Sequence, residues 1–186
     1  MGKVYQKLDD KLISFIQKQK LFFVSTAPLS QEGLINVSPK GLDCLRILDE
    51  HTVAYIDLTG SGAETIAHLK ENQRITFLFC AFEGPPKLVR LYGKGRVLER
   101  DSSAFEALKH LFPTYVSARS IIKVALHRIS DSCGYTVPLY DFKEDRDTMH
   151  KWVANKGEAA LVDYRKEKNS KSLDGLTAFE GKEKET

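Results

Sequence analysis

Six segments rich in β-forming residues, most of them joined by short connections, constrain the fold of this chain more than any other feature. They lie at residues 21–27, 34–38, 52–58, 75–82, 88–99 and 121–130, and residues 46–48 offer a further short strand. A doubly wound parallel sheet needs a helix at nearly every crossover, whereas the helical segments here are too few and too unevenly spaced. We therefore expect a mainly β fold, an antiparallel barrel with flanking helices packed outside it.

Helical spacing of apolar residues predicts the flanking helices. The first, near the N-terminus, has its apolar residues on one face and Asp9 or Asp10 available as its N-cap. Further helices are expected at residues 63–72, 102–112, 147–157 and 158–168. We expect a barrel domain over residues 1–140, a helical extension over 141–168, and a charged, mobile tail over 169–186.

The charge balance, 28 Lys and Arg against 25 Asp and Glu, is too even to indicate binding to nucleic acid or to an anionic membrane. No apolar run approaches the roughly 20 residues of a membrane span, and the polar N-terminus has no signal-peptide core. The three cysteines are far apart, and neither they nor the five histidines have metal-ligand spacing. We expect a cytoplasmic protein with reduced thiols, no metal site, and no nucleic-acid or membrane partner.

The sequence Thr-Gly-Ser-Gly at residues 59–62 lies between a predicted strand and a predicted helix. Glycines there allow backbone N–H groups to face one way, and the helix N-terminus adds positive potential, so the loop could hold a phosphate. The alternative is a capping box, in which Ser61 caps the helix and Glu64 reaches back. Taken alone, the pattern favours the capping box.

Three other places offer candidate side chains. Ser38, Pro39 and Lys40 end a strand with a hydroxyl and an ammonium group, which suit a phosphate or simply a polar strand exit. Arg90 lies between apolar residues on a strand and would line an anion pocket or face solvent outside the barrel. Cys133 would need a neighbouring base to act as a nucleophile, and a small, partly buried, inert cysteine is the simpler interpretation.

Taken together, these motifs resemble those of the FMN-binding split-barrel proteins related to pyridoxamine 5′-phosphate oxidase. The resemblance rests on the order and spacing of LFFVSTAPLSQEGLINVSPKG (21–41), YIDLTGSGAETIAHLKENQRITFLF (55–79), LVRLYGKGRV (88–97) and SDSCGYTVPL (130–139). It implies a six-stranded antiparallel split β-barrel. It also implies a homodimer with one FMN at each of two sites in the subunit interface.

The resemblance also implies which residues bind the cofactor. Carried over position by position, they are Ser38, Pro39, Lys40, Ser61, Gly62, Thr65, Arg90, Cys133, Gly134 and Tyr135. The stretch from Cys133 to Tyr135 would approach the flavin from the partner subunit. The family's oxidases carry an Arg-Lys pair at the start of the helix, where this chain has Glu64 and Thr65. The phosphate would then need Lys40, Thr65 and backbone N–H groups, and the resemblance supports the cofactor rather than pyridoxamine phosphate as substrate.

Two functions from different classes follow. The first is an oxidoreductase that uses FMN, with a small-molecule substrate or electron donor. The second is a non-catalytic module that binds FMN or another planar ligand without turnover, which the missing Arg-Lys pair favours. A small barrel that binds nucleic acid is a third class, and the even charge balance argues against it.

Overall fold

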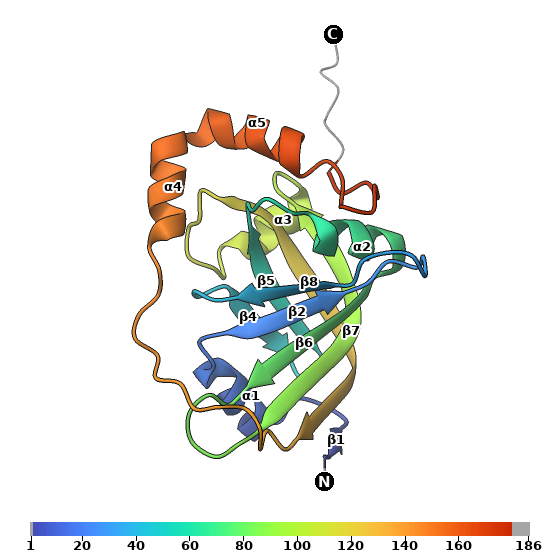
Figure 1. Cartoon of the computed structure of the whole chain (residues 1–186), viewed down its shortest axis with the longest axis vertical. Coiled ribbons are helices and arrows are strands. Elements are labelled where there is room, and N and C mark those ends of the chain that lie inside the picture. Colours follow the sequence, from blue (N-terminus) through green and yellow to red (C-terminus); the bar gives the residue numbers. More distant parts are fainter. Residues whose placement is uncertain (1, 180–186) are drawn as a thin grey trace.

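The chain folds into one antiparallel sheet that curves into a split β-barrel (Figure 1). The computed structural model describes residues 2–179. Within them the sheet has eight strands in the order β3-β2-β6-β7-β8-β5-β4, and β1 also pairs with β8. Their bounds are β1 Val4–Tyr5, β2 Phe22–Thr26, β3 Asn36–Lys40, β4 Leu45–Asp49, β5 Thr52–Leu58, β6 Arg74–Cys80, β7 Leu88–Glu99 and β8 Ala118–Ser132.

The predicted fold class is confirmed, although the count of six strands is too low for the described residues. The strands beyond the expected six are β1, with two residues, and β4, which contains the short strand offered at 46–48. A two-residue strand is too short for alternating hydrophobicity to reveal it. The long β7 and β8 pair along nearly their whole length, and their register shifts between Tyr92 and Gly93. A Cβ at Gly93 would collide with the Val124 side chain and would lie 2.6 Å from the carbonyl oxygen of Ala125.

The core lies inside the barrel, where inward side chains alternate with outward ones along each strand. On β2 the buried residues are Phe22, Val24 and Thr26, and the residues between them are partly exposed. Aromatic rings fill the centre, with the Phe22 and Phe79 ring centroids 5.4 Å apart and Tyr55 edge-on to Phe22.

Helices cover the two ends of the barrel (Figure 1). The first, α1 (Asp10–Lys18), packs at one end through Leu12 and Ile16, which are buried. Its N-cap is Asp9, one of the two residues that the sequence offered, and the Asp9 carboxylate accepts a hydrogen bond of 2.8 Å from the Leu12 N–H. At the opposite end lie α2 (Glu64–Asn72) and α3 (Ser103–Lys109).

Beyond the barrel, a long connection leads to α4 (Thr148–Lys156) and α5 (Glu158–Lys168), with Gly157 between the two helices. The predicted tail begins at residue 169, and its first eleven residues pack against the protein. Asn169 and Ala178 are fully buried there, and Lys171 bridges to Thr177. The rest of the predicted tail, 180–186, lies outside the described residues. Among residues 2–179, no helix is long and apolar enough to cross a membrane.

Candidate functional site

A buried charge cluster lies where β5 ends, close to the start of α2. Its centre is Asp57, which is 1% exposed. The Arg119 Nε lies 2.7 Å from one Asp57 oxygen, and the Lys40 Nζ lies 3.3 Å from the other. Two cations thus share one carboxylate that water hardly reaches. We call Lys40, Asp57 and Arg119 the Asp57 cluster.

Strand geometry brings these three residues together. Lys40 ends β3, opposite Phe22 of β2, and its side chain points to the inner side of the sheet, like Phe22. Asp57 pairs with Ser120 of β8, but the next residue, Leu58, pairs with Ala118. Arg119 is therefore the extra residue at a break in register of the β-bulge type, and such breaks re-aim a side chain.

The attraction of two cations outweighs the effect of burial on the pKa of Asp57. Burial alone would raise the pKa of this carboxyl group, but Arg119 first and Lys40 second outweigh it and hold the pKa below its ordinary value. Asp57 is therefore ionised at neutral pH, and the cluster keeps one positive charge in excess. A buried excess charge is costly unless an ion of opposite sign approaches it.

Three buried polar atoms have no hydrogen-bond partner among residues 2–179, and all belong to residues near this cluster in the fold. They are the Tyr55 hydroxyl, the Ser120 hydroxyl and the Asn169 side-chain oxygen. Tyr55 precedes Asp57 by two residues on β5, and its hydroxyl approaches Thr65 without the geometry of a hydrogen bond. Buried polar atoms are nearly always paired, so unpaired ones mark a place where water or a ligand completes the structure.

The loop before α2 differs from the predicted capping box. The helix has Ala63 as its N-cap and no side-chain hydrogen bond to that end, because it begins at Glu64 and leaves Ser61 exposed outside its first turn. The Glu64 carboxylate instead lies against Gly62, where a Cβ would collide with it. The Gly62 carbonyl accepts a hydrogen bond of 2.8 Å from Arg119. The capping-box prediction is therefore wrong, and the loop is tied to the Asp57 cluster.

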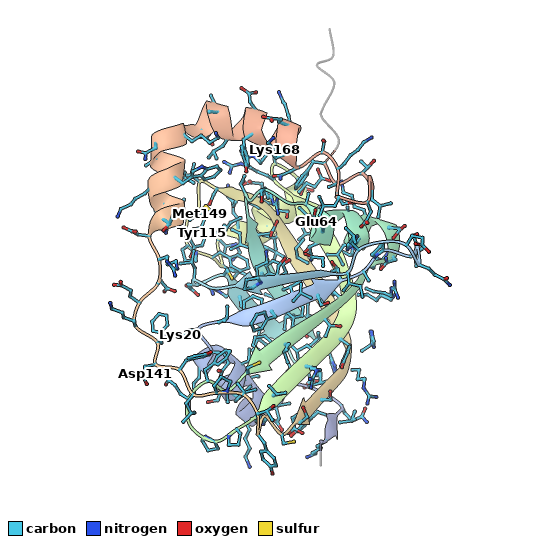
Figure 2. The ribbon with its side chains drawn as sticks, viewed as in Figure 1. Lys20, Glu64, Tyr115, Asp141, Met149 and Lys168 are labelled. Carbon is cyan, nitrogen blue, oxygen red and sulfur yellow. The ribbon has the colours of Figure 1, made fainter. Side chains whose placement is uncertain are left out.

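Several predicted binding residues meet at this place. Asn36 of β3 donates a hydrogen bond of 2.9 Å to the Thr65 hydroxyl and accepts one of 3.1 Å from the Ser38 hydroxyl. Lys40 and Gly62 are joined through Asp57 and Arg119. Pro39, by contrast, is exposed on the outer side of β3. Figure 2 shows Glu64 at the start of α2, at the same end of the molecule as Lys168 of α5.

The other predicted residues lie elsewhere in the chain. Arg90 is on the outer side of β7, between the buried Val89 and Leu91, and donates a hydrogen bond of 2.9 Å to the Ser132 hydroxyl. Tyr135 is 82% exposed. Cys133 is exposed, not partly buried as the simpler interpretation held, because it follows the end of β8 rather than lying within the sheet. A single chain does not bring these three residues to the Asp57 cluster.

Sequence reasoning missed Asp57, Arg119 and Tyr55. The signal was a carboxylate at an inward position of an otherwise apolar strand, two residues after an aromatic residue. A charge at such a position predicts a buried partner of opposite sign. Arg119 could not be assigned to that role, because the break in register that turns it inward leaves no mark on the hydrophobic pattern.

Known proteins resemble this chain in sequence and in fold. The family model described as pyridoxamine 5′-phosphate oxidase matches residues 8–133. The chain is 38% identical, over 191 aligned residues, to the pyridoxamine 5′-phosphate oxidase family protein ustO of Aspergillus flavus, covering 92% of this chain and 76% of that protein.

Two solved structures are similar in fold. HupZ of Group A Streptococcus is 19% identical, with a TM-score of 0.51 over 66% of this chain and 91% of that one. A variant of HupZ with one residue replaced is 20% identical, with a TM-score of 0.52 over 67% of this chain and 98% of that one. At such identities the likeness extends to the fold alone.

Proposed function

This chain belongs to the pyridoxamine 5′-phosphate oxidase family, and from that premise we propose that it is an FMN-binding oxidoreductase. The observation that carries the proposal is the Asp57 cluster, with its buried excess of positive charge beside unpaired polar atoms. FMN brings a phosphate, which is the kind of anion that such a cluster stabilises. The residues present therefore fit the cofactor.

Lys40 and Arg119 are the cations that would hold the phosphate. The Lys40 ammonium has three N–H donors and shares one ion pair with Asp57, and its side chain is 21% exposed. Arg119 donates from Nε to Asp57 and from one terminal nitrogen to Gly62. The family's oxidases carry an Arg-Lys pair at the start of this helix, and here Arg119 of β8 brings a guanidinium to the loop just before it, where it donates to the Gly62 carbonyl.

When bound, FMN supplies the redox chemistry, taking up or giving electrons or a hydride. The chain's own residues bind the phosphate, keep water away and fix the orientation of the ring. Thr65 and Ser38, linked through Asn36, carry two hydroxyl groups that would bind the phosphate together with the cations. Their fixed arrangement means that little reorganisation is needed when the cofactor binds.

We further propose that the protein is a homodimer with the cofactor between its subunits. The strand β3 is an edge of the sheet, and exposed apolar residues lie along it and just before it: Leu34, Ile35 and Val37. An exposed apolar edge strand is a surface that proteins normally cover. In such a dimer, Arg90, Cys133 and Tyr135 of one subunit would approach the cofactor bound to the other.

A second candidate function is a module that binds FMN without turnover. The observation that favours it is Glu64, which places a carboxylate beside Gly62 at the start of α2, where family oxidases carry a basic residue. Such a carboxylate opposes the phosphate, so the cofactor would be held less tightly than in the oxidases.

The absorption spectrum of the freshly purified protein tests the proposal. We expect a yellow protein whose bound flavin, once released, is FMN, and whose spectrum bleaches when NADH or NADPH is added and recovers in air. Bound FMN that neither cofactor reduces would support the non-catalytic module. Colourless protein that takes up no added FMN would contradict both functions.

A further inference from the structure

A cavity of about 1040 Å³ lies beside α1, away from the Asp57 cluster. Three stretches form it: the face of α1 with the residues that follow it, the turn between β6 and β7 at residues 81–85, and the segment 140–143. Its apolar wall consists mainly of Phe15, Leu21, Phe23, Phe82, Tyr140 and Phe142. Sites for small molecules are typically concave, largely apolar and of about 300–1,000 Å³.

The segment 140–143 is held over this cavity by specific contacts. The Tyr140 N–H donates a hydrogen bond of 2.9 Å to the Phe82 carbonyl, and the two rings have centroids 5.6 Å apart. The Lys20 Nζ lies 5.4 Å from the centre of the Phe142 ring. Figure 2 shows Lys20, just after α1, on the same side of the molecule as Asp141 of this segment. The cavity wall is thus built from chain segments far apart in the sequence.

The cavity and the Asp57 cluster lie on opposite sides of β2. Phe23 lines the cavity and points outward, whereas its neighbour Phe22 is buried and faces inward, like Lys40, with which it pairs. Neighbouring residues on a strand point to opposite faces of the sheet. The cavity is therefore a separate place from the one proposed for the phosphate of FMN.

Lysines outnumber carboxylates among the charged residues that line the cavity. The lysines are Lys11, Lys18, Lys20 and Lys143, and the acids are Asp10, Glu83 and Asp141. None of these seven residues forms an ion pair within residues 2–179. The Lys20 ammonium, placed over an aromatic ring of the wall, is positioned to meet an anionic group on a molecule lying against that ring.

We infer that this cavity binds a planar, apolar molecule that carries one anionic group, such as an aromatic carboxylate. The aromatic wall would stack against the flat body of the ligand. Lys20 would pair with its anionic group. This inference does not rest on FMN binding, because it involves neither Lys40 nor Arg119.

Calorimetric titration of the full chain with 2-naphthoate, in the presence of excess FMN, tests the inference. The uncharged isostere 2-naphthamide should bind about two- to fivefold more weakly, since a partly exposed ion pair contributes modestly. Lys20→Gln should remove that difference. Ser14→Trp, which places a large ring in the cavity from the exposed surface of α1, should weaken naphthoate binding by about tenfold or more.

The matched control is Gln17→Trp, at another exposed position on α1 that does not line this cavity. It should bind naphthoate as the unmodified protein does. The inference is overturned if naphthoate does not bind, if FMN competes with it, or if the two tryptophan variants weaken binding equally. Naphthamide that binds as tightly as naphthoate would overturn the assignment of an anionic ligand. Because FMN is not the reporter, a failure of FMN binding leaves this test intact.

Discussion

Lys40 and Arg119 both pair with the Asp57 carboxylate. Because little water reaches this carboxylate, the attraction between the charges is stronger than at the surface. Asp57 is 1% exposed and Arg119 is 6% exposed, so neither charge is screened as a surface ion pair would be. Removing one member of a buried pair is costly, since the partner stays buried without compensation. The cluster therefore matters to folding as well as to the proposed binding of phosphate.

Asp57→Asn should lower the free energy of unfolding by about 3–5 kcal/mol near neutral pH, because it leaves the buried Arg119 and the partly buried Lys40 without a carboxylate. The folded-state pKa of Asp57 lies below its ordinary value of 3.8, so its stabilising effect is complete above that pH. The effect is lost as the pH falls from 3.8 through the lower pKa of the folded protein. Urea unfolding of the unmodified protein and of Asp57→Asn measures both free energies of unfolding, and their difference should decrease below pH 3.8. A difference that stays the same at lower pH would contradict the role of the ionised Asp57 carboxylate.

At the scale of elements, the sequence predicts most of the strands and helices, and it does so where a local signal exists. The alternation along β2 and the acid before α1 are such signals, and both predictions are confirmed. The extent of α2 is close to the predicted 63–72, but its predicted capping box is wrong, because a Ser three residues before a Glu fits that motif whichever residue caps the helix. The sequence did not predict that Lys40, Asp57 and Arg119 lie together. Their meeting depends on pairing between strands far apart in the chain, which no local pattern encodes.

The C-terminal segment 169–179 covers the outside of α2. Asn169 donates a hydrogen bond of 2.9 Å to the Gly60 carbonyl, and Asp174 accepts one of 2.9 Å from the Leu34 N–H. The Asp174 carboxylate also lies 3.3 Å from the ring of His68, which is fully buried. This segment thus holds both the loop before α2 and the chain leading into β3 in place.

Truncation after Lys168 should therefore destabilise the protein by about 2–4 kcal/mol, since it removes several partly buried hydrogen bonds and leaves His68 without its acidic partner. The control is truncation after Phe179, which keeps every contact described above. Chemical unfolding followed by circular dichroism measures the free energy of unfolding of both truncated proteins. If the two truncated proteins unfold at the same denaturant concentration, the segment contributes nothing to stability.

On the scale of the whole molecule, the proposed dimer depends on the exposed edge strand β3. Val37→Lys, which places a charge on this strand where a valine is 62% exposed, should weaken dimerisation by at least about tenfold, because the charge would have to lose its water in the interface. Val162→Lys on α5 is the control, since that valine is also exposed. Analytical ultracentrifugation gives the dissociation constants. A stable monomer that still holds FMN would refute the shared site.

The affinity of the protein for FMN compared with riboflavin shows whether the Asp57 cluster holds the phosphate of FMN, because riboflavin lacks only that phosphate. We predict that the protein binds FMN more tightly than riboflavin. Lys40→Ala should weaken FMN binding by roughly 1.5–3 kcal/mol and leave riboflavin binding unchanged, whereas Lys123→Ala, an exposed lysine on β8, should change neither. Equal affinities for the two flavins, or a preference for FMN that Lys40→Ala leaves unchanged, would show that the phosphate does not lie at the Asp57 cluster.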